Sequence, residues 1–245
     1  MNDILHFQQL ASTNTFLEQM LQSQNRAKTP DCPDGLIVMT DFQTTGRGRQ
    51  TNSWHSERGK NLLMSILIYP HLPVEAQFRV TEWISLALAD HLRQNVGLEP
   101  QIKWPNDIYI NGKKIAGILI SHHWHSNEIA SSIIGIGLNL NQEQFPDTLP
   151  NPTSVFLENG KPSDLTETAI HIREQLSRLR KTDATTLHEE YLKLLYRRHV
   201  PALYTDTQSG ETFEGVIEGV NNIGLLEIRS GNTLRNYELN GIVYS

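Results

Sequence analysis

The spacing of apolar residues divides the chain into alternating strands and helices. Short apolar runs with little polar interruption predict buried strands. They lie at residues 35–40, 62–69 and 129–140. Apolar side chains that recur every three or four residues predict helices instead. They lie at residues 74–92, 164–179 and 184–197, and Ser12-Thr13-Asn14 predicts the capped start of a further short helix.

Turn residues organise the rest of the chain. Asn111-Gly112 stands between the extended runs 108–110 and 113–121, and this dipeptide strongly predicts a hairpin. After Pro201 the pattern changes to short strands separated by turns that contain Asn and Gly. These strands lie at residues 213–220, 225–228, 234–239 and 242–244. Such a series predicts a small β-barrel, so we divide the chain into domains of residues 1–204 and 205–245.

A long polar segment at residues 43–60 has no apolar period, and loops of this length are usually functional or disordered. Its Gly46-Arg47-Gly48-Arg49 sequence combines glycines, which let backbone N–H groups approach an anion, with two forked cationic side chains. Trp54 follows and offers an apolar face to a ligand. A solvated basic loop, or an arginine–glycine contact with RNA, remains an alternative explanation of these four residues.

The segment Lys-Trp-Pro-Asn-Asp at residues 103–107 is the second candidate for chemistry. Pro105 lacks the N–H that a strand ladder needs, so the strand breaks there and presents Asn106 and Asp107 at a cleft. The hairpin at Asn111-Gly112 folds Lys114 back toward Asp107. The alternative is an ordinary turn flanked by solvated lysines.

Glycines also interrupt the strand at residues 129–140. Gly135 and Gly137 resemble part of a dinucleotide-binding fingerprint, but Leu140 occupies the third glycine position and no helix pattern follows. We therefore interpret this segment as a strand on which the missing side chains leave room for a flat ligand.

The histidine cluster and the single cysteine each favour an interpretation without a chemical role. His122-His123-Trp124-His125 places two histidines on one strand face, but no carboxylate stands nearby at a ligand spacing, so a polar hairpin end is favoured over a metal site. Cys32 is the single cysteine, which excludes an internal disulfide and a multi-cysteine zinc site. No nucleophile motif surrounds it, and we interpret it as incidental.

Composition narrows the class of protein. The chain has 245 residues, enough for a real core, and a net charge of −6 from 21 Lys and Arg against 27 Asp and Glu. This balance argues against broad nucleic-acid binding, which needs clustered cations. No apolar run is long enough to span a bilayer, and the first residues lack the pattern of a signal peptide. We expect a soluble, cytoplasmic protein.

Together, these motifs resemble those of the biotin–protein ligase family, in the family's order and spacing. The matching segments are Ser12-Thr13-Asn14, Gln43-x2-Gly46-Arg47-Gly48-Arg49-x4-Trp54, Lys103-Trp104-Pro105-Asn106-Asp107, Lys114-x2-Gly117-x-Leu119 and Gly135-x-Gly137-x-Asn139. The resemblance implies an α+β fold with a mixed, mainly antiparallel sheet and flanking helices, similar to class II aminoacyl-tRNA synthetases. It also implies a small SH3-like β-barrel at the C-terminus.

The activity implied by the resemblance is ATP-dependent and has two steps. Biotin is activated as biotinyl-5′-AMP and then transferred to a lysine of a biotin carboxyl carrier protein or domain. Mg²⁺ is expected with ATP, held by phosphates and water, with no dedicated protein metal site. A lipoate or octanoyl ligase or transferase of the same fold is one alternative, and a biotin-sensing regulator without catalysis is another.

The resemblance also implies roles for individual residues. Catalysis is expected from Lys114, Arg49 and Asp107, with Asp107 orienting the acceptor amine. The expected biotin-binding residues are Ser12, Thr13, Asn14, Gln43, Gly46, Arg47, Gly48, Arg49, Lys114, Gly117, Gly135 and Gly137. The expected ATP-binding residues are Arg47, Arg49, Trp54, Asn106, Lys114 and Asn139.

Two departures from the family pattern matter. Asn52 stands where family members often carry another basic residue, so Arg58 or Lys60 would have to replace that phosphate contact. Some members begin with a helix-turn-helix domain, but here the Ser12 motif lies close to the first residue. We therefore expect no DNA binding and no membrane partner. A homodimer through a sheet edge is left open.

Overall fold

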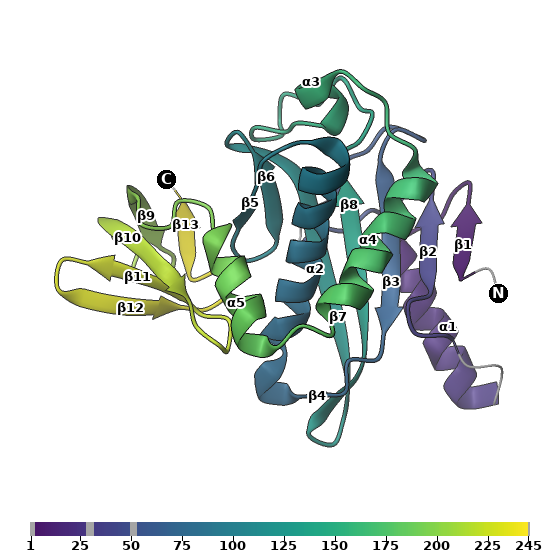
Figure 1. Ribbon diagram of the computed structural model, residues 1–245, viewed down its shortest axis with the longest axis horizontal. Coiled ribbons are helices and arrows are strands. Elements are labelled where there is room, and N and C mark those ends of the chain that lie inside the picture. Colours follow the sequence, from purple (N-terminus) through teal and green to yellow (C-terminus); the bar gives the residue numbers. More distant parts are fainter. Residues whose placement is uncertain (1–2, 28–31, 50–52, 245) are drawn as a thin grey trace.

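A large sheet forms the centre of the protein (Figure 1). The computed structural model describes residues 3–27, 32–49 and 53–244, so Asn52 lies outside the described residues. The sheet has eight strands in the order β1-β2-β3-β8-β7-β6-β5, with β4 paired to β8. The strands are β1 (Ile4–Phe7), β2 (Ile37–Thr40), β3 (Leu62–Ile68), β4 (Leu72–Pro73), β5 (Pro100–Lys103), β6 (Asp107–Ile110), β7 (Lys113–His125) and β8 (Glu128–Leu138). The β1–β2 pair is parallel and the other pairs between these strands are antiparallel, which confirms the predicted mixed, mainly antiparallel sheet.

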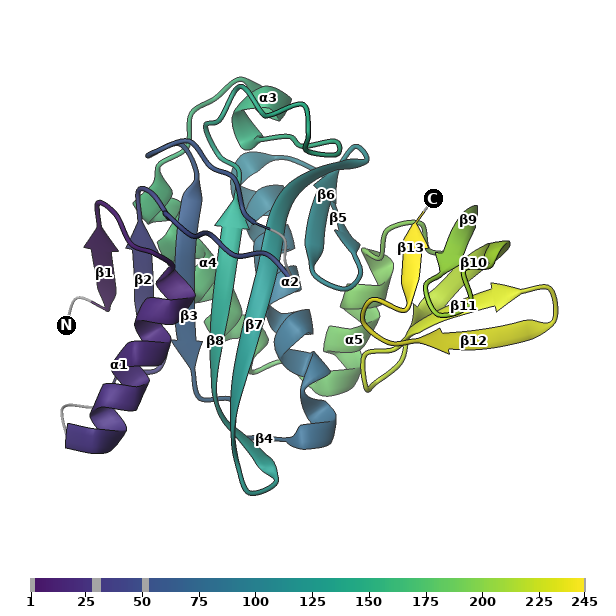
Figure 2. The ribbon, with the colours of Figure 1, turned by 180° about the vertical axis from the view of Figure 1, so that it is seen from behind.

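Helices cover both faces of this sheet. The helices α2 (Phe78–His91), α4 (Leu165–Leu179) and α5 (Ala184–Lys193) pack on one face (Figure 1), and α1 (Thr13–Ala27) packs on the other (Figure 2). The short α3 (Val155–Asn159) precedes α4, a 3₁₀ turn (Val74–Ala76) precedes α2, and a π turn (Leu92–Val96) follows it. These helices confirm the predicted α+β class.

Burial explains why the pattern predicted α2 well. This helix is apolar on most of its surface because it lies between the sheet and α4 and α5. By contrast, α1 buries one stripe, in which Leu17 packs against Val38 of β2 and Ile133 of β8. Asp164 and Asp183 cap α4 and α5, since their side chains accept hydrogen bonds from backbone N–H groups three residues on.

The β6–β7 hairpin forms where Asn111-Gly112 predicted it. Both residues have positive φ, 49° and 74°, as the two central residues of a type I′ hairpin turn require. The pairing places Lys114 opposite Tyr109, and Asp107 opposite Gly117. This register brings Lys114 and Asp107 to the same region, as the sequence predicted.

The C-terminal part is a separate antiparallel sheet of five strands in the order β12-β11-β10-β9-β13. Its strands are β9 (Pro201–Asp206), β10 (Thr212–Val220), β11 (Leu226–Ser230), β12 (Thr233–Tyr237) and β13 (Ile242–Tyr244). The predicted boundary between residues 204 and 205 falls inside β9. Because β9 pairs with both β10 and β13, we propose that the C-terminal domain begins at Pro201.

Other differences from the predicted elements have local causes. Helix α5 ends at Lys193 instead of residue 197, and Arg197 and His199 that follow have positive φ values of 58° and 60°. Strand β7 continues to His125, so the histidine cluster lies on the strand itself. Strands β1 and β9 and helix α3 were not predicted, because each is short and has no distinctive period.

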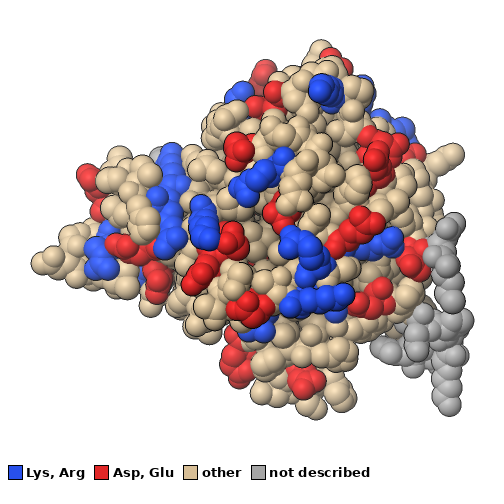
Figure 3. Space-filling model, viewed as in Figure 1, with Lys and Arg blue, Asp and Glu red and all other residues tan. Residues whose placement is uncertain are grey.

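The distribution of charge on the surface and the hydropathy of the helices bear on two of the sequence predictions, those on nucleic acid and on membranes. Lys and Arg side chains alternate with Asp and Glu over the helical face, with no extended basic stripe there (Figure 3). None of the described helices is long and apolar enough to cross a membrane.

Candidate functional site

A polar cavity of about 210 Å³ lies against the sheet, between the start of α1, the loop after β2 and the β6–β7 hairpin. Segments far apart in sequence meet there. Its lining residues are Ser12, Thr13, Asn14, Gln43, Arg47, Gly48, Arg49, Ser53, Trp54, Met64, Asn106, Asp107, Lys114, Gly117, Ile118, Leu119, Gly135, Ile136, Gly137 and Asn240.

Uncharged hydrogen-bonding groups form one end of this cavity. Gln43 Oε1 accepts a hydrogen bond from the backbone N–H of Thr13 at 2.9 Å and lies 3.3 Å from its hydroxyl. The Ser65 hydroxyl lies within hydrogen-bond distance of Thr13 Oγ1 (2.7 Å) and of Asn14 Oδ1. Asn14 Nδ2 donates to Leu119 O at 3.3 Å. This buried end of the cavity presents amide and hydroxyl groups and suits a neutral polar ligand group.

Glycines on β7 and β8 make room for the side chains around this cavity. A Cβ atom at Gly135 would lie 2.9 Å from the amide carbon of Asn14, and one at Gly137 would lie 2.7 Å from the Trp54 ring. The sequence predicted that these glycines leave room for a ligand. In the structure that room is occupied by Asn14 and Trp54, which themselves line the cavity.

Charged groups gather at the other end of the cavity. Lys114 Nζ lies 2.7 Å from Asp107 Oδ1, and the two side chains are 33% and 19% exposed. The ammonium also lies 5.8 Å from the centre of the Trp54 ring. Arg49 Nη1 donates to Asn106 Oδ1 at 3.3 Å. Burial lowers the pKa of the Arg49 guanidinium, and the nearby Asp107 carboxylate opposes that shift.

A second cavity, of about 400 Å³, adjoins the first at Trp54 and Lys114. The other residues around it are Ser53, His55, Asn139, Phe145, Thr148, Leu149, Pro150 and Pro152. Asn139 Oδ1 and Trp54 Nε1 are buried and have no hydrogen-bond partner in the part of the chain that the structure describes. Buried polar atoms are normally paired, so these two are open to a ligand.

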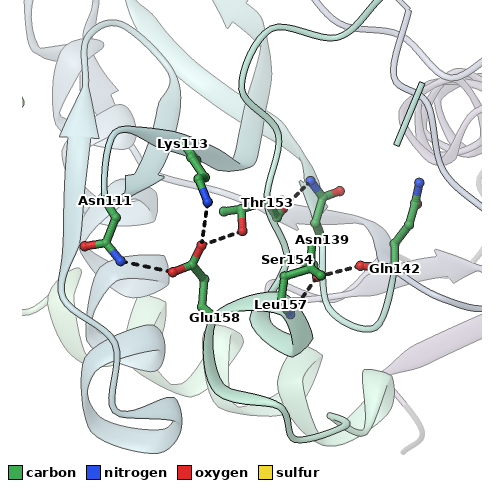
Figure 4. A network of polar contacts seen from close by, with 8 residues as sticks. All are labelled: Asn111, Lys113, Asn139, Gln142, Thr153, Ser154, Leu157 and Glu158. Carbon is green, nitrogen blue, oxygen red and sulfur yellow. Dashed lines mark hydrogen bonds and ion pairs between the residues drawn. The ribbon is translucent and has the colours of Figure 1, made fainter. Parts of the chain in front are cut away.

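A network of polar contacts fixes the wall of the second cavity (Figure 4). Asn139 Nδ2 donates to Thr153 O at 2.9 Å, which ties the end of β8 to the loop before α3. Glu158 of α3 accepts from Thr153 Oγ1 at 2.6 Å and from Asn111 of the β6–β7 turn at 3.0 Å. Lys113 Nζ lies 4.0 Å from Glu158 and takes part in this network, and Lys113 is absent from the lining of both cavities, unlike Lys114.

Most of the candidate residues predicted from the sequence surround the first cavity. Gly46 and Asn139 do not. Gly46 belongs to the loop after β2 but does not line the cavity; its carbonyl accepts a hydrogen bond from the Trp54 N–H at 3.1 Å. Asn139 lines the second cavity. Asn106, predicted to bind ATP with Asn139, lies instead with Arg49 in the first cavity and donates to Ile118 O at 3.0 Å.

Ser65 and Asn240 are among the residues at or beside the site that were not predicted from the sequence. Ser65 contacts both Thr13 and Asn14, and its signal was a buried hydroxyl inside the otherwise apolar strand β3. Asn240 lines the cavity from the C-terminal domain. Nothing in its local sequence beyond a turn-forming Asn-Gly pair could have indicated this position.

Within the described ranges, no group of three or more His, Cys, Asp or Glu side chains could hold a metal ion. His122 Nδ1 lies 2.8 Å from Ser132 Oγ, and burial lowers the pKa of His122.

We compared the sequence with a family model and with known proteins. Residues 6–139 match the model of the biotin/lipoate A/B protein ligase family. Over 209 residues, the sequence is 34% identical to the bifunctional ligase/repressor BirA of Bacillus spizizenii, a match that covers 82% of this chain and 64% of that relative. Over 128 residues it is 30% identical to the biotin–[acetyl-CoA-carboxylase] ligase of Mycobacterium tuberculosis, covering 51% of this chain and 46% of the relative. The chain therefore spans less than two thirds of the length of these relatives.

Solved structures share the fold. The biotin protein ligase from Aquifex aeolicus, solved in complex with biotin and ATP, matches over 100% of both chains with a TM-score of 0.77. The sequence identity of that match is 21%, so it shows the likeness of the fold.

Proposed function

The chain belongs to the biotin/lipoate A/B protein ligase family, and on that premise we propose that it is a biotin–protein ligase. It activates biotin as biotinyl-5′-AMP with ATP and transfers the biotinyl group to a lysine of a biotin carboxyl carrier protein or domain. The named relatives include biotin ligases, which supports biotin over lipoate or octanoate as the acyl group.

One observation carries the proposal. Lys114 lines both cavities and stands where they adjoin, so a single ammonium faces an uncharged amide and hydroxyl pocket on one side and a tryptophan–asparagine cavity on the other. The first suits the ureido group of biotin and the second suits adenine. The reacting carboxylate and α-phosphate would then meet beside Lys114.

The first step joins two anions and so needs positive charge fixed in advance. A biotin carboxylate oxygen attacks the α-phosphorus, the bond from that phosphorus to the bridging oxygen breaks, and pyrophosphate leaves. Lys114 and Arg49 stabilise the negative charge that builds up on the phosphoryl oxygens, and since both are held by neighbours before substrate binds, little reorganisation is needed. Enclosure of the intermediate protects it from water.

In the second step the ε-amine of the acceptor lysine attacks the acyl carbon, and the bond from that carbon to the AMP oxygen breaks. The amine must lose a proton, and its pKa of about 10.4 leaves it mostly protonated at pH 7. Asp107 is the one carboxylate among the described residues that line the first cavity, so we assign it the task of orienting the amine and accepting the proton.

The lining also bears on the metal that accompanies ATP. With Asp107 as the one carboxylate in the described lining, the donor set fits a Mg²⁺ ion coordinated mainly by phosphate oxygens and water. When bound, the ion would neutralise part of the phosphate charge. The proposed reaction consumes ATP and modifies a metabolic carrier protein. For this reason we propose a cytoplasmic location.

The proposal is tested with the purified full chain, Mg²⁺, ATP and a biotin carboxyl carrier domain. We expect radiolabelled biotin to become attached to the carrier lysine, and ATP–pyrophosphate exchange to depend on biotin. A lipoyl domain with lipoate or octanoate is the matched control. Labelling of that domain instead would assign the chain to the lipoate branch of its family, and tight biotin binding without exchange would identify a sensor.

Changing Asp107 to asparagine is expected to slow transfer from supplied biotinyl-5′-AMP to the carrier by about a hundredfold at pH 7, because a general base typically contributes two to four orders of magnitude. The deficit should shrink toward pH 9, since more of the acceptor amine is then already deprotonated. Single-turnover transfer measured from pH 6 to pH 9 checks this. A pH-independent deficit would contradict the role as a base and leave only a role in positioning Lys114.

A further inference from the structure

Arg49 is held between the two domains. Its Nη1 donates to Asn106 in the catalytic domain, and its Nη2 donates at 3.0 Å to the side-chain oxygen of Asn240. Asn240 belongs to the turn between β12 and β13 and lines the first cavity. An arginine proposed to hold the phosphate thus has a side-chain partner in the C-terminal domain as well as one in the catalytic domain.

The turn that carries Asn240 has a defined geometry. The N–H of Gly241 donates to Glu238 O at 2.9 Å, and Asn240 has a φ of +71°, a conformation that asparagine adopts more readily than most residues. Thr207 at the end of β9 ties the turn down, since its hydroxyl donates to Asn240 O at 2.7 Å. The side-chain amide is therefore presented to Arg49 by a fixed backbone.

The C-terminal sheet is also fastened beside the catalytic segment 103–107 (Figures 1 and 2). Trp104 Nε1 donates to the carbonyl of Gly224 at 3.0 Å. Lys103 Nζ lies 4.7 Å from the centre of the Tyr244 ring, within cation–π range. Two residues of the motif therefore bind the C-terminal domain, while the two that follow Pro105 line the cavity.

We propose that Asn240, supplied by the C-terminal domain, is a positioning residue that orients Arg49 toward the phosphate of ATP and of biotinyl-5′-AMP. This inference rests on the proposed function. Two amide oxygens, one on Nη1 and one on Nη2, hold the guanidinium without contributing a negative charge of their own. A carboxylate at residue 240 would instead compete with the phosphate for the guanidinium.

The test variant is Asn240→Gly, because glycine keeps the positive φ while the amide is lost. Losing one hydrogen bond to a charged group is expected to raise KM for ATP about tenfold and to speed the release of biotinyl-5′-AMP by a similar factor. The midpoint of thermal unfolding should change little, whereas kcat for adenylate formation should fall, because a misoriented Arg49 stabilises the phosphoryl charge less well. Ser126→Gly is the matched control, since exposed Ser126 also has a positive φ, 55°, in the β7–β8 turn and lines none of the cavities described.

A double-mutant cycle separates positioning from a general effect on the fold. If Asn240 acts through Arg49, adding Asn240→Gly to Arg49→Ala should change KM for ATP no further, whereas independent effects would multiply. Multiplying effects, or an unchanged KM in an active Asn240→Gly protein, would overturn the inference alone. A wild-type chain without biotin-dependent exchange would overturn the proposed function and this inference with it.

Discussion

Replacing Lys114 with alanine is expected to slow the formation of biotinyl-5′-AMP by about two to three orders of magnitude, the usual effect of removing one preorganised group that stabilises transition-state charge. The reason is its place at the junction of the two cavities, where the carboxylate and the α-phosphate of the proposed reaction would meet. Biotin-dependent ATP–pyrophosphate exchange measures this step directly. Arg49 remains in the variant, so a residual rate is expected.

The matched control for this prediction is Lys113→Ala. Lys113 is the preceding residue of the same strand, but its ammonium lies 4.0 Å from Glu158 and the residue lines neither cavity. Both variants remove one lysine from β7, so a general effect of charge or strand propensity would appear in both. An exchange rate for Lys114→Ala equal to that of Lys113→Ala would show that Lys114 does not stabilise the reaction.

Local patterns predicted those parts of the site that are built locally. The Asn111-Gly112 turn sets Lys114 opposite Tyr109, two residues from Asp107, and the Lys114 side chain then reaches the Asp107 carboxylate. Buried strands and the apolar helix α2 were likewise predicted because their periodicity reflects burial directly. Ser12-Thr13-Asn14 marked the start of α1 because a polar residue ahead of an apolar period is typical of an N-terminal cap.

Contacts between distant segments could not be predicted in this way. Ser65 and Asn14 are 51 residues apart, and Arg49 and Asn240 are 191 residues apart. No periodicity encodes such pairs, because they depend on how β3, the loop after β2 and the C-terminal sheet assemble. For the same reason, the sequence predicted open space for a ligand beside Gly135 and Gly137. Missing side chains on β8 indicated open space, but the sequence could not show that Asn14 and Trp54 enter it.

Because Asn14 occupies the space beside Gly135, we expect Gly135→Ala to weaken biotin binding strongly. The new methyl group would lie 2.9 Å from the amide carbon and nitrogen of Asn14, closer than side chains tolerate. Asn14 is 6% exposed and bound to Ser65 and to Leu119 O, so it cannot retreat without losing those hydrogen bonds. The clash displaces Asn14 and so removes hydrogen-bonding groups from the proposed biotin pocket. Leaving a buried polar partner unsatisfied costs about 1–3 kcal/mol, which corresponds to biotin affinity about 5- to 150-fold weaker in a calorimetric titration.

Gly219→Ala provides the comparison that isolates this contact. Gly219 also lies within a strand, β10, but an added methyl group there would meet its nearest neighbour, Leu192, at an ordinary 3.5 Å. Both variants exchange a strand glycine for alanine, so a change in backbone entropy or strand propensity affects them alike. A loss of biotin affinity in Gly135→Ala that is absent from Gly219→Ala, in a protein that stays folded at the assay temperature, would tie the loss to Asn14. Equal biotin affinity in the two variants would instead mean that biotin does not bind at this end of the cavity, and the ureido pocket would have to be sought elsewhere along the sheet.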